Sequence, residues 1–188
     1  AAVLAPYAVS EVGAAVMWRY MLDPGIGPIS HILSSLGIPP LQWNVTAWQA
    51  LGVVSLMSIW LHLPFTFIIL YAARLGLPGD LYEAARIDGA TPWQMFRRIT
   101  LPLMMPAILV ALVFRYIFAF RLFTEVWLLT LGGPARSTEV IAVYLYLQAF
   151  RYYEFGVASA TAWLMAIVAP LIAAFYLRRM YRGIVANV

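Results

Sequence analysis

The chain of 188 residues contains no cysteine. It also contains no lysine, and all twelve of its basic residues are arginine. Without cysteine there can be no disulfide framework, thiolate metal site or cysteine nucleophile. Without lysine there can be no Walker-type phosphate loop, whose lysine contacts the nucleotide phosphates. Charged residues are also scarce, at 11% of the chain, whereas a soluble domain carries about a quarter. A soluble protein is therefore disfavoured.

Apolar residues make up 64% of the sequence and gather in four long stretches. A bilayer core needs about 20 predominantly apolar residues per helix. We therefore predict an all-α, polytopic membrane protein with about four transmembrane helices, in a single transmembrane domain over residues 1–188. The stretches are residues 1–22, 48–73, 102–129 and 155–177, and a short interfacial helix is predicted over 29–36.

The chain begins at Ala1 in an apolar run that has no basic n-region and no cleavage site. These features are typical of a start inside a transmembrane segment rather than of a signal peptide. We expect that an N-terminal part of the protein is missing.

Arginines are distributed unevenly between the two sides of the predicted membrane. Cytoplasmic loops carry the excess of Lys and Arg, so the richer side is predicted to be cytoplasmic. This places the central loop and the C-terminus in the cytoplasm, with basic side chains beside lipid headgroups rather than on a nucleic acid. The richer side holds Arg74, Arg86, Arg97, Arg98, Arg178, Arg179 and Arg182, and the other side holds Arg19, Arg136 and Arg151.

The segment 78–102 is too polar to cross a membrane but carries ordered helix signals. Asp80 and Glu83 have the three-residue spacing of a capping pair, which predicts a short helix from there to residue 87 or 88. Gly89 follows at the place where a helix ends in a left-handed residue. The segment is therefore predicted to turn sharply at Gly89.

A second helix is predicted immediately after this corner. Thr91 and Gln94 have the spacing of a capping box, and Pro92 occupies the first helical position. The whole loop is thus a helix, a glycine corner and a helix. Two interpretations remain open: the loop receives a partner protein, which we favour, or it is a stable hairpin on the protein's own cytoplasmic rim.

Seven residues of this loop resemble a known family signature. The pattern is similar to the EAA signature, E-A-A-x3-G-x9-I-x-L-P, of permease subunits in binding-protein-dependent ABC importers. Flanking residues such as Asp88, Pro134 and Thr138 resemble the carbohydrate-uptake branch of that family, which includes maltose, trehalose and glycerol-3-phosphate permeases. The signature residues are Glu83, Ala84, Ala85, Gly89, Ile99, Leu101 and Pro102.

The resemblance implies the type I ABC importer permease fold, with a six-helix core of which four helices are left here. It implies that 78–102 couples to a cytoplasmic ATPase, with Glu83 and Gly89 at the contact. It also implies a second homologous permease, two ATPase subunits and an extracellular or periplasmic solute-binding protein as partners. ATP and Mg would be bound by the ATPase, so this chain needs no cofactor and no catalytic residue.

Charged residues inside the predicted spans are candidates for the translocation path. Charges at this depth are costly and are usually functional, so Arg115 either contacts solute or forms a buried pair with Glu11 or a helix-end carbonyl. Glu11 is itself a second candidate for the path. Arg121 and Glu125 are four residues apart, which predicts an ion pair on one helix face.

Other functional classes find less support in the residues. A secondary transporter or channel gives no role to the EAA-like loop, and a membrane enzyme lacks a catalytic constellation. His31 and His62 have no companions at ligand spacing, so no metal site is predicted. For His62, beside Pro64, a packed side chain bonded to a carbonyl freed by the proline is favoured over a solute contact. The resemblance to the carbohydrate-uptake branch implies a sugar or related small polar molecule as the solute.

Overall fold

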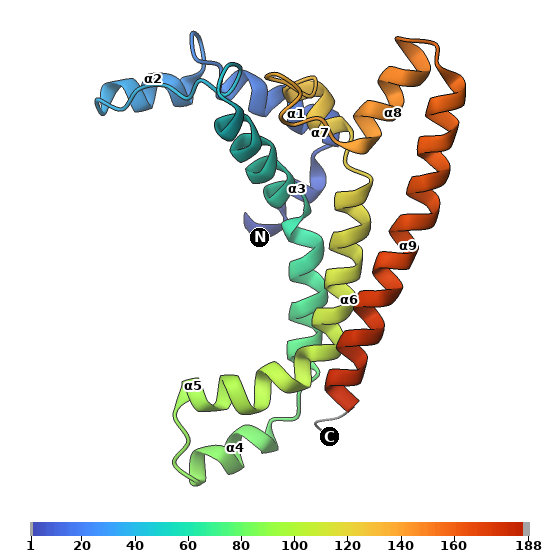
Figure 1. Cartoon of the computed structure of the whole chain (residues 1–188). Coiled ribbons are helices and arrows are strands. Elements are labelled where there is room, and N and C mark those ends of the chain that lie inside the picture. Colours follow the sequence, from blue (N-terminus) through green and yellow to red (C-terminus); the bar gives the residue numbers. More distant parts are fainter. Residues whose placement is uncertain (1, 186–188) are drawn as a thin grey trace. The chain divides into compact units, whose positions relative to one another are not determined.

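The computed structural model describes residues 2–185, and the side chains of residues 3–178. The described part of the chain is all-α and contains no strand. Figure 1 shows the course of the chain. The elements are η1 (Ala2–Ala8), α1 (Glu11–Met21), α2 (Pro28–Ser35), α3 (Ala47–Leu75), α4 (Asp80–Ile87), α5 (Pro92–Met95), η2 (Phe96–Thr100), α6 (Leu101–Phe120), α7 (Thr124–Leu129), α8 (Ile141–Phe150) and α9 (Phe155–Val185).

Among the described residues, three helical segments are long and apolar enough to cross a membrane. They are Ala47–Leu75, Pro92–Phe120 and Phe155–Arg178. Two of them confirm the stretches predicted at 48–73 and 155–177. The short helix predicted at 29–36 is also present, as α2.

The first apolar stretch does not form the transmembrane helix that we predicted. Residues 2–8 form the 3₁₀ helix η1, and Ser10 then starts a new helix by accepting the backbone N–H of Gly13 at 3.1 Å. Eleven residues follow in α1, which at 1.5 Å per residue span about 16 Å, half of a bilayer core. The capping bond of Ser10 therefore divides the apolar stretch 1–22, although its composition is that of one continuous span.

The third stretch is also divided in the structure. We predicted one helix over 102–129, but α6 ends at Phe120 and α7 begins at Thr124. No glycine or proline marks this stop. The short α7 instead buries Val126 and Leu129 in an apolar core. The break between α6 and α7 therefore depends on tertiary packing, which the hydrophobic periodicity of the sequence does not reveal.

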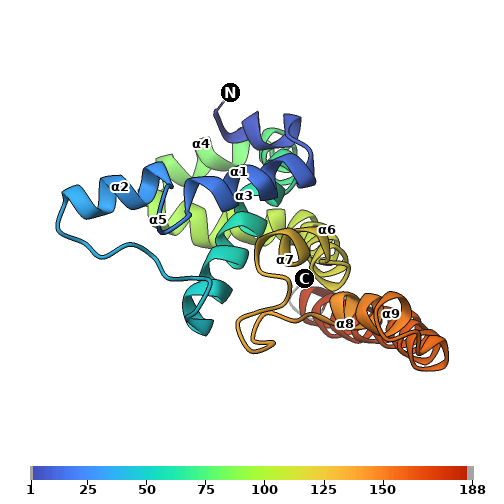
Figure 2. The ribbon, with the colours of Figure 1, turned by 90° about the horizontal axis from the view of Figure 1, so that it is seen from above.

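Two compact units divide the chain, and unit 1 comprises residues 1–64 and 119–168. Its core forms where α1 packs on α7, and the small Ala14 and Ala15 are fully buried there, which permits close helix approach. Two long-range bonds fix the periphery: Arg19 Nη1 donates to the Leu128 carbonyl at 3.2 Å, and Trp43 Nε1 donates to the Leu22 carbonyl at 2.7 Å. Figure 2 shows α2 extending away beyond α1.

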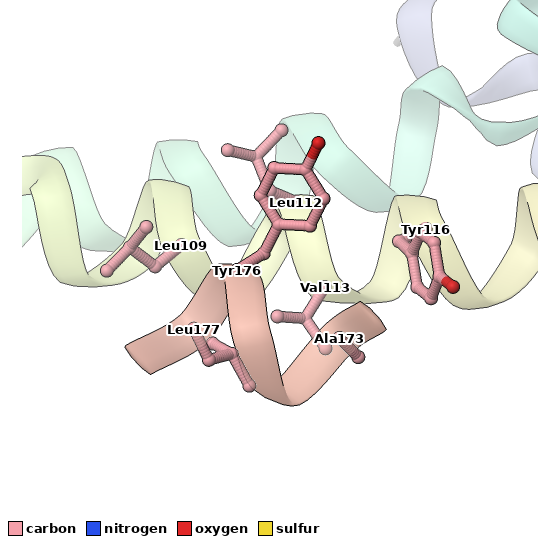
Figure 3. Close-up of a pocket in the computed structure, with 7 residues that line it drawn as sticks. All are labelled: Leu109, Leu112, Val113, Tyr116, Ala173, Tyr176 and Leu177. Carbon is pink, nitrogen blue, oxygen red and sulfur yellow. The ribbon is translucent and has the colours of Figure 1, made fainter. Parts of the chain in front are cut away.

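Unit 2 comprises residues 65–118 and 169–188. The ring of Phe65 packs edge-on against Phe114 and Phe118, with centroids 5.1 and 5.5 Å apart, and so joins α3 to α6. An apolar cavity of about 280 Å³ lies between α6 and α9 (Figure 3). Its lining consists of Leu109, Leu112, Val113, Tyr116, Ala173, Tyr176 and Leu177.

Candidate functional site

The loop between α3 and α6 lies within unit 2 and begins with α4. Its start at Asp80 and its end at Ile87 confirm the predicted bounds. The predicted capping pair is wrong, because Gly79 is the N-cap residue and no side chain caps the helix. Asp80 and Glu83 both lie in the first turn, where their carboxylates favour the helix through its dipole instead.

The corner after α4 has the geometry that we predicted. Gly89 has a φ of +76°, in the left-handed region that favours glycine. Its N–H donates to the Arg86 carbonyl at 3.0 Å, and the Ala90 N–H donates to the Ala85 carbonyl at 2.9 Å. This is the Schellman arrangement, which satisfies carbonyls at the end of α4 and fixes the direction in which the chain leaves it.

A capping box starts the next helix, as predicted. The Thr91 N–H donates to Gln94 Oε1 at 2.7 Å, and the Gln94 N–H donates to Thr91 Oγ1 at 3.4 Å. Pro92 occupies the first turn, where its missing N–H costs no bond. Figure 1 shows α4 and α5 lying one below the other and joined at this corner.

The second helix does not end before the membrane span, as a separate short helix would. It passes through the π-helical turn η2 into α6, so that residues 92–120 form one helical segment. Pro102, near the start of α6, cannot donate to the carbonyl of Arg98, and a wider turn at this point accommodates that loss. The loop is therefore continuous with a membrane helix.

Three side chains join α4 to the neighbouring helices. The hydroxyls of Tyr82 and Thr100 lie 2.8 Å apart, and Thr100 is buried at the end of η2. The guanidinium carbon of Arg74, in the last turn of α3, lies 4.6 Å from the centroid of the Tyr82 ring. No periodic signal in the sequence indicates this cluster, because Tyr82 lies 8 positions from Arg74 and 18 from Thr100.

Large apolar side chains are exposed on the loop, although it carries the polar sequence of a segment outside the membrane. Ile87 is 87% exposed and Trp93 is 68% exposed, and the Trp93 ring stacks on Phe96 with centroids 5.5 Å apart. Glu83 and Arg86, on α4, are exposed as well. We call Glu83, Ile87, Trp93 and Phe96, with the corner at Gly89, the loop surface. Apolar groups in such a setting are typical of a protein contact.

The seven signature residues occupy two parts of this loop. Four lie on α4 and the corner, and of these Ala85 is half-buried while the others are exposed. Three lie where η2 passes into α6, with Ile99 and Leu101 half-buried and Pro102 exposed. The structure thus brings together Glu83, Ala84, Ala85 and Gly89 in one part, and Ile99, Leu101 and Pro102 in the other.

The two candidates for a translocation path lie in different units. Arg115 is half-buried in α6 within unit 2, and Glu11 is exposed in the first turn of α1 within unit 1. Because the two residues belong to different units, a buried pair between them stays a prediction. The apolar cavity of unit 2 is not lined by Arg115.

The predicted ion pair between Arg121 and Glu125 on one helix face is wrong. Arg121 is exposed in the turn after α6, whereas Glu125 is buried in the first turn of α7. The break between the two helices removes the one-turn spacing on which that prediction depended.

His62 is bonded to the backbone, as the favoured interpretation expected. Its Nδ1 lies 2.9 Å from the carbonyl oxygen of Ser58, one turn earlier in α3. The carbonyl that Pro64 leaves without a donor is that of Trp60, so this bond is not the one we expected.

These features define a polytopic membrane protein that presents a helix–corner–helix with exposed apolar side chains at the start of one of its candidate spans. The chain belongs to the family of the binding-protein-dependent transport system inner membrane component, whose profile matches residues 14–181.

Relatives and solved structures agree with this assignment. The trehalose/maltose transport system permease protein MalF of Thermococcus litoralis is 38% identical over 95% of this chain and 60% of its own length. The crystal structure of a bacterial ABC transporter involved in the import of the acidic polysaccharide alginate matches 96% of this chain and 63% of that one, with a TM-score of 0.86 and 30% identity. The same kind of transporter in complex with an alginate pentasaccharide-bound periplasmic protein matches with a TM-score of 0.83 and 31% identity, over 92% of this chain and 60% of that one. The chain spans about 60% of the length of the curated relatives it matches.

Proposed function

We propose that this chain is a permease subunit of an ATP-driven ABC importer and forms part of the translocation path for a sugar or related small polar solute. The observation that carries the proposal is the EAA-like signature on an exposed helix–corner–helix that is continuous with a membrane helix. A partner protein that binds such a loop outside the membrane can move the membrane helix that continues from it. The relative named for trehalose and maltose transport supports this solute class.

The loop surface is proposed to seat on a cytoplasmic ATPase subunit. Exposed Ile87 and Trp93 would supply apolar contact, and exposed Glu83 would supply a charged one. ATP and Mg would be bound and hydrolysed by two such subunits, so this chain has a transport role with no cofactor and no catalytic residue. In this arrangement residues 78–102 are the coupling loop of a single transmembrane domain.

Two further partners are proposed, a second homologous permease and an extracellular or periplasmic solute-binding protein. The solved transporter in complex with an alginate pentasaccharide-bound periplasmic protein supports the latter. Arg115, in the candidate span 92–120, and Glu11, at the start of α1, remain the candidates for contact with the solute.

The orientation is proposed from the arginines, with the coupling loop and the C-terminus in the cytoplasm of a bacterial inner membrane. Arg74, Arg86, Arg97 and Arg98 all lie at the α4 and α5 end of unit 2. The side chains of Arg179 and Arg182, which also support this orientation, lie outside the described residues.

A secondary transporter or channel is the competing function, and it differs in its energy source. We expect the full-length permease, reconstituted in vesicles with its neighbouring ATPase, second permease and binding protein, to accumulate solute only when ATP is enclosed. Ionophores that dissipate ion gradients should leave this uptake unchanged. Uptake without ATP that collapses with the gradient would contradict the proposal.

A further inference from the structure

We propose that Tyr82 is a positioning residue that transmits the movement of α4 to the membrane helices α3 and α6. The inference rests on the function proposed above, because it assigns a path for the movement that an ATPase would impose on the loop. It concerns a residue that lies beside the signature and outside it.

Tyr82 contacts both membrane helices at once. Its hydroxyl lies 2.8 Å from Thr100 Oγ1, one residue before α6 begins, and its ring lies under the guanidinium of Arg74 in the last turn of α3. Thr100 is 7% exposed, so its hydroxyl has little access to water and depends on a protein partner. Tyr82 supplies that partner.

The helix α4 has few other means of acting on its neighbours. It contains eight residues, none of them buried, and a helix of this length is marginal without tertiary contacts. In the described part of the chain, the bond from Tyr82 is the only side-chain hydrogen bond between α4 and another element. Otherwise α4 is tied to α3 through residues 76–79 and to α5 through the Gly89 corner.

The chemistry of a tyrosine suits this task. The ring is rigid and occupies a fixed place between two helices, while the hydroxyl adds a directional bond at its far end. A displacement of α4 is thus passed to the base of α6 and the end of α3 together. Tyr82 belongs to the relay and is distinct from the exposed side chains of the loop surface.

The test removes the bond from each side in the complete transporter. Tyr82→Phe keeps the ring over Arg74 but deletes the hydroxyl, and Thr100→Val deletes the other partner at nearly constant volume. We expect each variant to retain the ATPase, while solute transported per ATP hydrolysed falls about threefold to tenfold, the range of one hydrogen bond. The double variant should be no worse than either single variant, because both lose the same bond.

Two control variants separate transmission from general damage. Thr100→Ser keeps the hydroxyl that Thr100→Val removes, so its transport-to-hydrolysis ratio should lie close to the wild-type value. Tyr71→Phe deletes a tyrosine hydroxyl from an exposed position on α3 and should leave that ratio unchanged.

An unchanged ratio of solute transported to ATP hydrolysed in Tyr82→Phe and Thr100→Val would overturn the inference. A smaller amount of membrane-inserted protein with an unchanged ratio would overturn it too, because Tyr82 would then only support the structure. Failure of the wild-type chain to bind an ATPase would instead overturn the proposed function.

Discussion

Replacing Gly89 with valine is expected to release the ATPase from the permease and to stop solute uptake, while the protein stays in the membrane at near-normal levels. The φ of Gly89 is +76°, where an L-residue costs about 1 to 2 kcal/mol and a β-branched residue is a genuine outlier. A Cβ at this position meets no atom within 4 Å, so the damage is to the corner and to any partner seated on it. We expect the amount of ATPase that co-purifies with the variant to fall about fivefold to thirtyfold. This is the change in an equilibrium that about 1 to 2 kcal/mol produces.

Two matched variants identify the cause of this loss. Gly79→Val adds the same side chain in equally open space, but at a glycine with a right-handed φ of −63°, and should retain the ATPase. Gly89→Asn tolerates the left-handed conformation and should fall between Gly89→Val and the wild-type chain.

Glu83→Ala should act in the same direction as Gly89→Val. Since Glu83 is exposed and caps nothing, its loss should cost little folding stability. Wild-type uptake and full ATPase retention in both Gly89→Val and Glu83→Ala would make the loop a mere connector.

The second large effect is expected from Arg115→Ala, which should abolish solute uptake while leaving the ATPase bound. Arg115 is the fifteenth of the 20 residues of α6, and an arginine costs at most about 2.5 to 3.5 kcal/mol on insertion scales, the value for a helix centre. Replacing Arg115 with alanine removes this insertion cost, so the variant should reach the membrane normally if the residue serves the path. The measurement is uptake normalised to the amount of assembled complex.

Arg115→Lys is the matched variant, because it keeps the charge but loses the planar fork of donors. A path residue that binds solute oxygens through that fork should lose much of its uptake in Arg115→Lys as well. Disappearance of the Arg115→Ala protein from the membrane would contradict the path assignment and favour a structural role.

Short-range chemistry explains which parts of the loop could be predicted from the sequence. The left-handed corner at Gly89 and the capping box of Thr91 and Gln94 depend on residues within four positions of one another. Hydropathy likewise predicts α3 and α9, because a bilayer selects for length and composition alone.

The parts that could not be predicted depend on distant contacts or on competing local bonds. Helix α6 ends at Phe120 within an apolar run, because α7 is drawn into the core of unit 1. Ser10 starts α1 inside a stretch that otherwise has the composition of a span. The bond between Tyr82 and Thr100 joins residues 18 positions apart, and no repeat in the sequence indicates it.

The central claim is that the loop surface seats on a cytoplasmic ATPase, and cross-linking from Ile87 tests it most directly. Ile87 is 87% exposed, so Ile87→Cys should carry a thiol-linked photo-reactive group without disturbing the fold. Ile32→Cys on α2, also well exposed, is the control that the proposed orientation places across the membrane. We predict that light links Ile87→Cys to the ATPase in the active complex and that Ile32→Cys gives no such product. No ATPase adduct from Ile87→Cys, or its labelling from outside intact cells by a membrane-impermeant thiol reagent, would contradict the account.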